Sequence, residues 1–195
     1  MVPPDKNYIE KSDNELVALS LKKKEFYRYL IERYEKKLIR YIMRLAMLRN
    51  EDAEDILQEV FIKVYINLND FDKSLKFSSW IYRITHNETI NYLRKRKSRL
   101  NTSYSDINEI IINNIRADLD IEGDIDKKYL KNNIEKAMSS IDKKYQEVLI
   151  LKYMESKDYK EISDILRKPI GTVATLLKRA KEQLKKQMQK SEAFF

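Results

Sequence analysis

Carboxylate side chains are concentrated in one short segment of this chain. Glu51, Asp52, Glu54, Asp55 and Glu59 place five carboxylates within nine residues, although the whole chain carries a net charge of +8. Carboxylates in such a group can coordinate a divalent cation or pair with basic side chains of a partner. Glu51, Asp52 and Asp55 are the candidate metal ligands, but the sequence has no second ligand cluster to complete a catalytic site. We therefore favour ion pairing with a protein partner.

The residue types present exclude several other kinds of site. The chain has no cysteine and a single histidine, His86, which rules out a disulfide framework, a thiolate or histidine metal cluster and a Ser-His triad within the chain. We expect no catalytic residue, no metal and no cofactor, and we expect His86 to be an exposed or capping residue. No apolar run approaches the ~20 residues of a membrane span. The N-terminus lacks the apolar core of a signal peptide, so a cytoplasmic protein is expected.

The elements that position these side chains are predicted to be helices throughout. Two glycines and three prolines among 195 residues favour an all-α protein with few tight turns. In the acidic segment, apolar residues recur at 53, 56, 57, 60, 61, 64 and 68, which is the spacing of one buried stripe on a helix over 51–68. The same reasoning predicts one or two helices within 15–47, a helix over 77–97, and helices near 130–138, 145–154, 159–166 and 169–189.

The distribution of charge indicates two domains and a nucleic-acid partner. Residues 1–97 carry a net +5, residues 98–126 a net −5, and residues 127–195 a net +8. Two basic blocks separated by an acidic one are typical of segregated binding surfaces rather than of a uniformly solubilising charge. We predict a lead-in (1–14), a first helical domain (15–98), a flexible acidic linker (99–128) that could include a helical turn near 107–116, a second helical domain (129–190) and a tail (191–195).

A pair of helices near the C-terminus indicates contact with DNA. The short helix over 159–166, the break at Arg167-Lys168 and the helix that starts at Pro169 match a helix-turn-helix, whose second helix enters the major groove. Proline is tolerated in the first turn because its missing N–H has no partner there. A plain helical hairpin with a solvated basic face would give the same pattern, so the shape alone leaves both interpretations open.

Three strings, in this order, resemble the extracytoplasmic-function (ECF) sigma factors, the small promoter-recognition subunits of bacterial RNA polymerase. DAEDILQEVF (52–61) resembles the polymerase-binding helix of that family, region 2.2. FD (71–72), KFSSWIYRI (76–84) and the residues from Asn87 to Arg96 resemble the promoter-melting segment, regions 2.3 and 2.4. YKEI (159–162), PIGTV (169–173) and KRA (178–180) resemble the minus-thirty-five reader, region 4. The resemblance covers roughly residues 20–98 and 129–188.

The resemblance implies an initiation factor made of sigma regions 2 and 4. Its partners would be core RNA polymerase (the β′ clamp and the β flap), promoter DNA and a cognate anti-sigma factor. It implies polymerase contacts at Asp52, Asp55, Gln58 and Glu59. It implies minus-ten contacts at Lys73, Lys76, Trp80, Arg83, Asn87, Asn91, Arg94, Lys95 and Arg96. It implies minus-thirty-five contacts at Tyr159, Lys160, Gly171, Thr172, Thr175, Lys178 and Arg179.

Several of these residues allow a second interpretation. Asn87 is the choice for a base contact, in a segment (85–87) that reads as loop-like. Trp80 and Tyr82 could stack on extruded bases, although aromatic residues at helical core spacing are more often buried. Family members usually carry basic residues where this chain has Ala174 and Leu176, and an aspartate is common where Asn91 stands. These departures affect which bases are read, not the class.

The length of the linker constrains how the two domains could reach a promoter. Thirty residues span only ~30 Å as a free coil but ~100 Å when extended. Promoter elements two helical turns apart are ~70 Å from each other, so the linker must be stretched; in the family it threads the RNA channel of polymerase.

A stand-alone helix-turn-helix regulator is the rival interpretation. Its N-terminal half would sense a signal or dimerise, and it would bind duplex DNA without polymerase. A sigma factor should bind promoter DNA well only as part of the holoenzyme, so the two interpretations differ in their need for polymerase.

Overall fold

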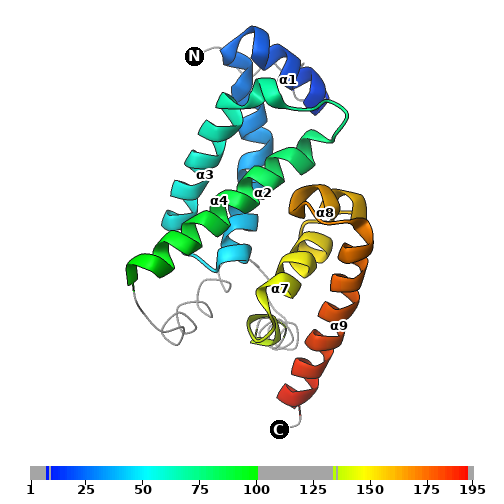
Figure 1. The fold of residues 1–195 in the computed structure, drawn as a ribbon. Helices are drawn as coiled ribbons and strands as arrows, with labels where there is room; N and C mark the ends of the chain where they lie inside the picture. Colours follow the sequence, from blue (N-terminus) through cyan, green and yellow to red (C-terminus); the bar gives the residue numbers. More distant parts are fainter. Residues whose placement is uncertain (1–7, 9, 101–133, 135, 193–195) are drawn as a thin grey trace, which may run out of the picture.

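The protein is built of helices wherever the structure describes it. The computed structural model describes residues 8, 10–100, 134 and 136–192 (Figure 1). No strand occurs among them, and the predicted all-α class is confirmed. Residues 101–128 of the expected linker, with the helical turn near 107–116, and residues 193–195 of the tail lie outside the described part.

The helices fall on either side of that gap. Before it come α1 (Asp13–Lys22), the 3-10 turn η2 (Lys24–Phe26), α2 (Tyr27–Ala46), α3 (Asn50–Ile66), the 3-10 turn η3 (Leu68–Asp70) and α4 (Phe77–Leu100). After it come α7 (Lys143–Leu149), the π-helical turn η5 (Ile150–Met154), α8 (Tyr159–Leu166) and α9 (Ile170–Glu192). Helix α4 continues past the expected domain end at residue 98.

Helices α2, α3 and α4 pack against one another to form the core of the first part. The apolar stripe predicted for the acidic segment is confirmed, because its members on α3 are all buried: Ala53, Ile56, Leu57, Val60, Phe61 and Val64. Removing a large apolar side chain from water contributes about 1.5–3 kcal/mol. The stripe therefore fixes α3 on α2 and leaves its acidic side outward.

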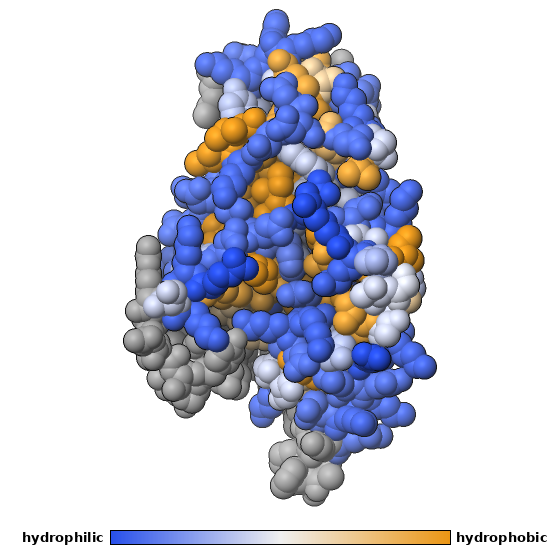
Figure 2. Space-filling view, viewed as in Figure 1, coloured by the Kyte–Doolittle hydropathy of each residue, from blue (hydrophilic) through white to orange (hydrophobic). Residues whose placement is uncertain are grey.

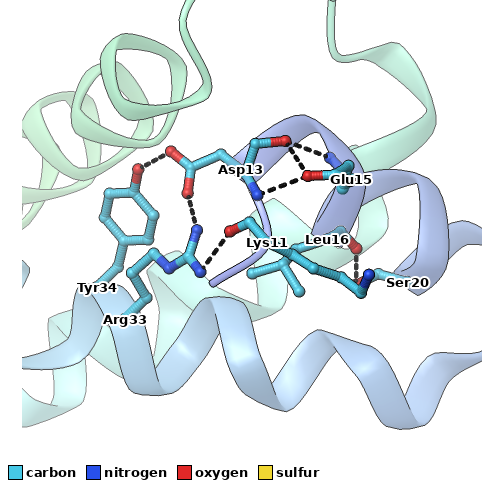
Figure 3. Close-up of polar contacts among 8 residues, drawn as sticks. Lys11, Asp13, Glu15, Leu16, Ser20, Arg33 and Tyr34 are labelled. Atoms are coloured by element: carbon cyan, nitrogen blue, oxygen red, sulfur yellow. Dashed lines mark hydrogen bonds and ion pairs between the residues drawn. The ribbon is translucent and has the colours of Figure 1, made fainter. Parts of the chain in front are cut away.

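Helix α1 is fastened to α2 by polar contacts (Figure 3). Ser12 caps α1 through a capping box with Glu15, which satisfies backbone N–H groups that have no helical partner. Asp13 accepts hydrogen bonds from Arg33 at 2.7 Å and from the hydroxyl of Tyr34. The ring of Tyr34 meets Phe77, the first residue of α4, edge-on at 5.6 Å. The lead-in expected to run loosely to residue 14 therefore already includes the cap and first residues of α1.

The middle of α4 corrects two expectations. His86 is buried, not exposed or capping, and its Nδ1 lies 2.9 Å from the hydroxyl of Tyr41. Residues 85–87 are helical rather than loop-like. Buried threonines fit there because Thr85 and Thr89 donate hydroxyl hydrogen bonds to the carbonyls of Ile81 and Thr85, both at 2.8 Å. Their polarity is satisfied inside the helix, so it does not interrupt α4.

The second part departs from a regular helix at one point. The helix predicted near 145–154 is split into α7 and the π-helical turn η5. Its i to i+5 pattern appears in the hydrogen bond from the N–H of Glu155 to the carbonyl of Ile150 at 3.0 Å. An inserted residue of this kind rotates the later side chains around the helix axis. Met154, at the end of the helix predicted near 145–154, is exposed.

The predicted helix pair α8 and α9 is present and packed together. Asp158 and Glu161 form a capping box at the start of α8. Arg167 ends α8 in the left-handed conformation, at φ 51°, and α9 starts three residues later, at Ile170. Ile162 and Ile165 of α8 and Val173 and Leu177 of α9 are buried in the hydrophobic core.

The buried imidazole predicts a loss of stability in mild acid. Burial, reinforced by the charge of Lys168, lowers the pKa of His86 to about 4. An unfolded histidine has a pKa of about 6.5. The unfolded chain therefore binds the extra proton first, and stability falls as the pH decreases from 6.5 toward 4. The free energy of unfolding in urea should be about 2 kcal/mol lower at pH 5 than at pH 7 on this account.

His86→Gln serves as the control for that measurement. Burial raises the pKa of Glu147, which acts in the opposite direction but is common to both proteins, so their difference reports on His86. As the single histidine, His86 can also be titrated by NMR without assignment ambiguity. An imidazole that titrates near 6.5 in the folded protein would contradict the prediction.

Candidate polymerase and promoter interfaces

The outward side of α3 carries most of the residues expected to bind polymerase. Asp55, Gln58 and Glu59 are exposed, and their spacing of three and four residues puts them on one side of the helix. The other side is buried against α2 and α4. The three side chains therefore project from a surface that is already rigid, in a geometry suited to guanidinium groups of a facing helix.

Asp52 differs from the other three. It is half-buried, accepts a hydrogen bond from the hydroxyl of Tyr92 at 3.1 Å, and lies 3.7 Å from a guanidinium nitrogen of Arg96. Asp52 was expected at the polymerase surface and Arg96 at the minus-ten surface. The structure brings the two together, so the start of α3 and the end of α4 form one polar edge. An ion pair as exposed as this one contributes at most about 1 kcal/mol.

Sequence reasoning missed an apolar continuation of the α3 surface. Ile62, Tyr65 and Ile66 are exposed and follow Gln58 and Glu59 along the helix. Figure 2 shows apolar surface near the C-terminal end of α3, in an otherwise largely hydrophilic view. The signal was available, because these residues are apolar yet fall off the buried stripe at 53, 56, 57, 60, 61 and 64.

The minus-ten candidates follow α4 and the loop before it, with different exposures. Lys73, Lys76, Asn87, Arg94 and Lys95 are exposed. Arg83, Asn91 and Arg96 are half-buried. The exposed cations lie at the two ends of this segment, with Lys73 and Lys76 before α4 and Arg94 and Lys95 near its end. This separation suits contacts to different phosphates of one strand.

Trp80 is the one buried member of this set. It is 6% exposed and lies against Phe71 and Phe77, with ring centroids at 5.4 and 5.6 Å. Tyr82, the other aromatic candidate for stacking, is 2% exposed. In this conformation, both rings support the surface from beneath and neither offers a face to a base.

Two minus-ten candidates lie against the second half of the chain. Lys76 has its ammonium 3.5 Å from carboxylate oxygens of both Asp158 and Glu161, at the start of α8. The charge of Glu161 raises the pKa of Lys76. Burial, reinforced by the charge of Arg167, lowers the pKa of Arg83. Helices α4 and α8 therefore share the surface on which Lys76 and Arg83 stand.

The minus-thirty-five candidates form an open surface on α8 and α9. All are exposed: Tyr159, Lys160, Gly171, Thr172, Thr175, Lys178 and Arg179. The hydroxyl of Thr175 donates to the carbonyl of Gly171 at 2.9 Å, which leaves its oxygen free to accept. A Cβ added at Gly171 would meet nothing within 4 Å, so the start of α9 is unobstructed. Backbone N–H groups at such a start can bind phosphate.

The two departures from the family pattern in α9 lie deeper than these residues. Ala174 and Leu176 are half-buried, and Leu176 packs against the hydrophobic core. Base reading by α9 therefore depends on the exposed side chains around them.

A second exposed apolar group lies near the start of α8. Tyr153, Met154 and Tyr159 are exposed, and lysine ammonium groups lie over two of the rings. Lys181 is 5.7 Å from the ring centroid of Tyr153, and Lys152 is 5.3 Å from that of Tyr159. Sequence reasoning missed Tyr153 and Met154 as surface residues, because the π-helical turn in which they lie has no clear sequence signal.

Membrane-spanning helices and metal clusters are both absent from the described residues. None of the helices there has the length and apolar character needed to cross a bilayer. No group of three or more His, Cys, Asp or Glu side chains in the same residues is arranged to hold a metal ion.

Comparison with known proteins shows the family of the chain. The family model for sigma-70 region 2 matches residues 30–99, and that for sigma-70 region 4 matches residues 131–184. The ECF RNA polymerase sigma factor SigW of Bacillus subtilis is 36% identical over 164 residues, which is 82% of this chain and 87% of SigW. The ECF RNA polymerase sigma-E factor of Haemophilus influenzae is 26% identical, over 85% of this chain and 89% of that protein.

The chain belongs to the ECF RNA polymerase sigma factors. Members of this family are transcription initiation factors rather than catalytic enzymes, and the rival interpretation as a stand-alone regulator is set aside. As a sigma factor, the protein binds core RNA polymerase and directs promoter-specific initiation.

Solved structures show the same fold at low sequence identity. CnrH, solved with the cytosolic domain of CnrY, has a TM-score of 0.66 and 18% identity, over 92% of this chain and 98% of CnrH. RpoE of Bartonella quintana, solved with the anti-sigma factor NepR, has a TM-score of 0.62 and 18% identity, over 84% of this chain and 96% of RpoE.

The position of Trp80 in this sigma factor predicts a structural effect of its replacement. Trp80→Ala should lower the free energy of unfolding by about 3–5 kcal/mol, because it empties the space between Phe71 and Phe77. Urea unfolding measures this loss. Trp80→Phe, which retains an apolar ring, should lose clearly less. Unchanged stability of Trp80→Ala would show that the ring is not packed as described.

Proposed function

We propose that the exposed side of α3 is the docking surface for the β′ clamp of core polymerase. Asp55, Gln58 and Glu59 supply the polar contacts, and Ile62 extends the surface with apolar area. The observation that carries this proposal is that the carboxylates stand on the free side of a helix whose other side is fully packed. Such a surface loses little conformational entropy on binding, and its charges steer a basic partner. Asp52 contributes at the edge, through its contact with Arg96.

The proposal has a direct test in holoenzyme formation. Asp55→Lys and Glu59→Lys should each weaken binding to core polymerase at least tenfold, because a repulsive charge replaces an attractive one. Titration of core polymerase with labelled protein, followed by fluorescence anisotropy, measures the affinity. Glu35→Lys makes the same charge change at an exposed site on α2 and should bind normally. Equal affinities of all four proteins would exclude this docking surface.

The basic face of α4 is assigned to the melted minus-ten strand. Lys73, Lys76, Arg94, Lys95 and Arg96 are suited to phosphates. Asn87, Asn91 and Arg83 stand between them and carry donors that fit base edges. Trp80 is assigned to the support of this face from below.

The start of α9 is assigned to the major groove of the minus-thirty-five element. Thr172, Thr175 and Arg179 are the base-reading candidates, Lys178 and Lys160 face phosphates, and Tyr159 borders the contact. The open surface at Gly171 supports a close approach of the helix start to the backbone of DNA.

Two substitutions separate base reading from phosphate binding at this surface. Arg179→Ala should cost about 1–3 kcal/mol and relax the preference for the native minus-thirty-five sequence. Lys178→Ala should weaken binding to all sequences and reduce the salt dependence by about one counterion. Holoenzyme binding to native and scrambled minus-thirty-five duplexes at several salt concentrations measures both.

Lys136→Ala is the matched control, since it removes an exposed positive charge from the same half of the chain. It should leave both the sequence preference and the salt dependence unchanged. Identical behaviour of Arg179→Ala and Lys136→Ala would exclude base reading by Arg179.

Three further contacts are proposed for this sigma factor. Tyr153, Met154 and Tyr159 form an exposed apolar surface that fits the β flap of polymerase. An anti-sigma factor is proposed because structurally similar sigma factors were solved with CnrY and NepR. The linker is proposed to span the two domains in the cytoplasmic holoenzyme, with domain boundaries at 15–98 and 129–190.

A further inference from the structure

The two halves of the chain meet at a set of charged contacts. Glu155, just after the turn η5, lies 2.8 Å from Arg44 of α2 and accepts a hydrogen bond from the hydroxyl of Tyr82 of α4 at 2.7 Å. The ammonium of Lys157 lies 4.1 Å from the ring centroid of Tyr82. Beside them, α8 lies along α4 (Figure 1). We call Glu155, Arg44, Tyr82 and Lys157 the interdomain latch.

Burial makes the latch more than a chance surface contact. The side chain of Glu155 is 6% exposed, and Lys157 is 9% exposed. A buried charge is costly unless a partner compensates it. Arg44 and Tyr82, which bind the carboxylate of Glu155 directly, both belong to the first half of the chain. Arg44 and Tyr82 can compensate the charge of Glu155 only while the two halves of the chain are together. Removing one of these partners should therefore weaken the contact between the halves strongly.

A second group of contacts lies at the start of the basic face assigned to the minus-ten strand, the minus-ten face, around Lys76 and Arg83. Asp158 and Glu161 place carboxylate oxygens 3.5 Å from the ammonium of Lys76, and the hydroxyl of Ser78 lies 3.5 Å from Glu161. These carboxylates occupy the position that a DNA phosphate would take at Lys76. Arg83 lies in the same contact, near the charges of Arg167 and Asp164.

The contact is also incompatible with the distance between promoter elements. Here α8, the first helix of the helix-turn-helix, packs against α4 beside Lys76 and Arg83. Promoter elements two helical turns apart are instead ~70 Å from each other. The two halves must separate before both elements are bound. Breaking the latch costs free energy, so only a fraction of the free molecules is open. The apparent affinity for polymerase and promoter is reduced in proportion to that fraction.

We propose that the free sigma factor is autoinhibited by its own second domain, which the interdomain latch holds on the minus-ten face with Asp158 and Glu161 in place of DNA phosphates. This inference rests on the proposed function of α4. Opening of the latch precedes stable engagement of core polymerase and promoter. Any partner that binds Arg44 or Glu155 in place of the contact between them shifts the sigma factor toward the open state.

Intramolecular energy transfer in the full-length chain tests the closed state. Because the protein has no cysteine, Lys36→Cys on α2 and Glu182→Cys on α9 give unique labelling sites at exposed positions. The labelled protein should show efficient transfer at low salt. Glu155→Gln should shift the ratio of closed to open molecules at least tenfold toward open, and transfer should fall. Low transfer in the parent protein would overturn the closed state.

Charge reversal provides an internal control for the latch. Arg44→Glu alone should open the protein, and Arg44→Glu combined with Glu155→Arg should restore transfer. Asp142→Asn removes a carboxylate from an exposed site in the same half of the chain and should change nothing. Circular dichroism of each variant reports whether its helices are retained. Failure of the double variant to regain transfer over Arg44→Glu would overturn the pairing.

The affinity for core polymerase tests whether the closed state inhibits polymerase binding, separately from whether the closed state exists. Glu155→Gln should bind core polymerase three- to tenfold more tightly than the parent, and Asp142→Asn should bind equally. Opening without any gain in affinity would overturn autoinhibition while leaving the docking surface on α3 intact. If neither the parent nor any variant bound core polymerase, the proposed docking would fail, and autoinhibition with it.

Discussion

The packing of α4 is the interaction on which the rest of the structure depends. One side of this helix is fixed by the edge-on contact of Tyr34 with Phe77 at its start and by the hydrogen bond between Tyr41 and His86 near its middle. Arg94 and Lys95, near the end of the helix, remain exposed. Because α3 packs on the same helix, the position of α4 also sets the angle between the acidic surface and the basic face.

A face that binds a polyanion is also a face that binds carboxylates. Lys76, just before α4, cannot distinguish a phosphate from the carboxylates of Asp158 and Glu161 by charge alone. The difference must come from geometry and from the number of contacts. The second half of the chain places two carboxylates, Asp158 and Glu161 at the start of α8, beside Lys76. Regulation of this kind needs no additional domain, because the same capping box that starts α8 supplies the competing charges.

Much of the organisation was predictable because it depends on residues close in the chain. The buried stripe of α3 and the pair α8 and α9 follow from periodicity and from a proline near a helix start, which are local signals. The environment of His86 was not predictable, since its partner Tyr41 lies 45 residues away. The segment 85–87 was expected to be loop-like, yet the hydroxyl of Thr85 donates to a carbonyl within the helix and stays buried.

The candidate surfaces also include features that local sequence patterns predict and features that depend on contacts between distant residues. The amino-acid sequence by itself determined the helices, the acidic side of α3 and the basic character of α4 and α9, because side-chain direction on a helix repeats every few residues. Only the tertiary structure decided that Trp80 supports the minus-ten face instead of lying on it, that Asp52 meets Arg96, and that Glu155 is buried against Arg44. Those outcomes depend on which helices pack together and at what angle, and contacts between residues far apart in the chain leave no local pattern in a single sequence.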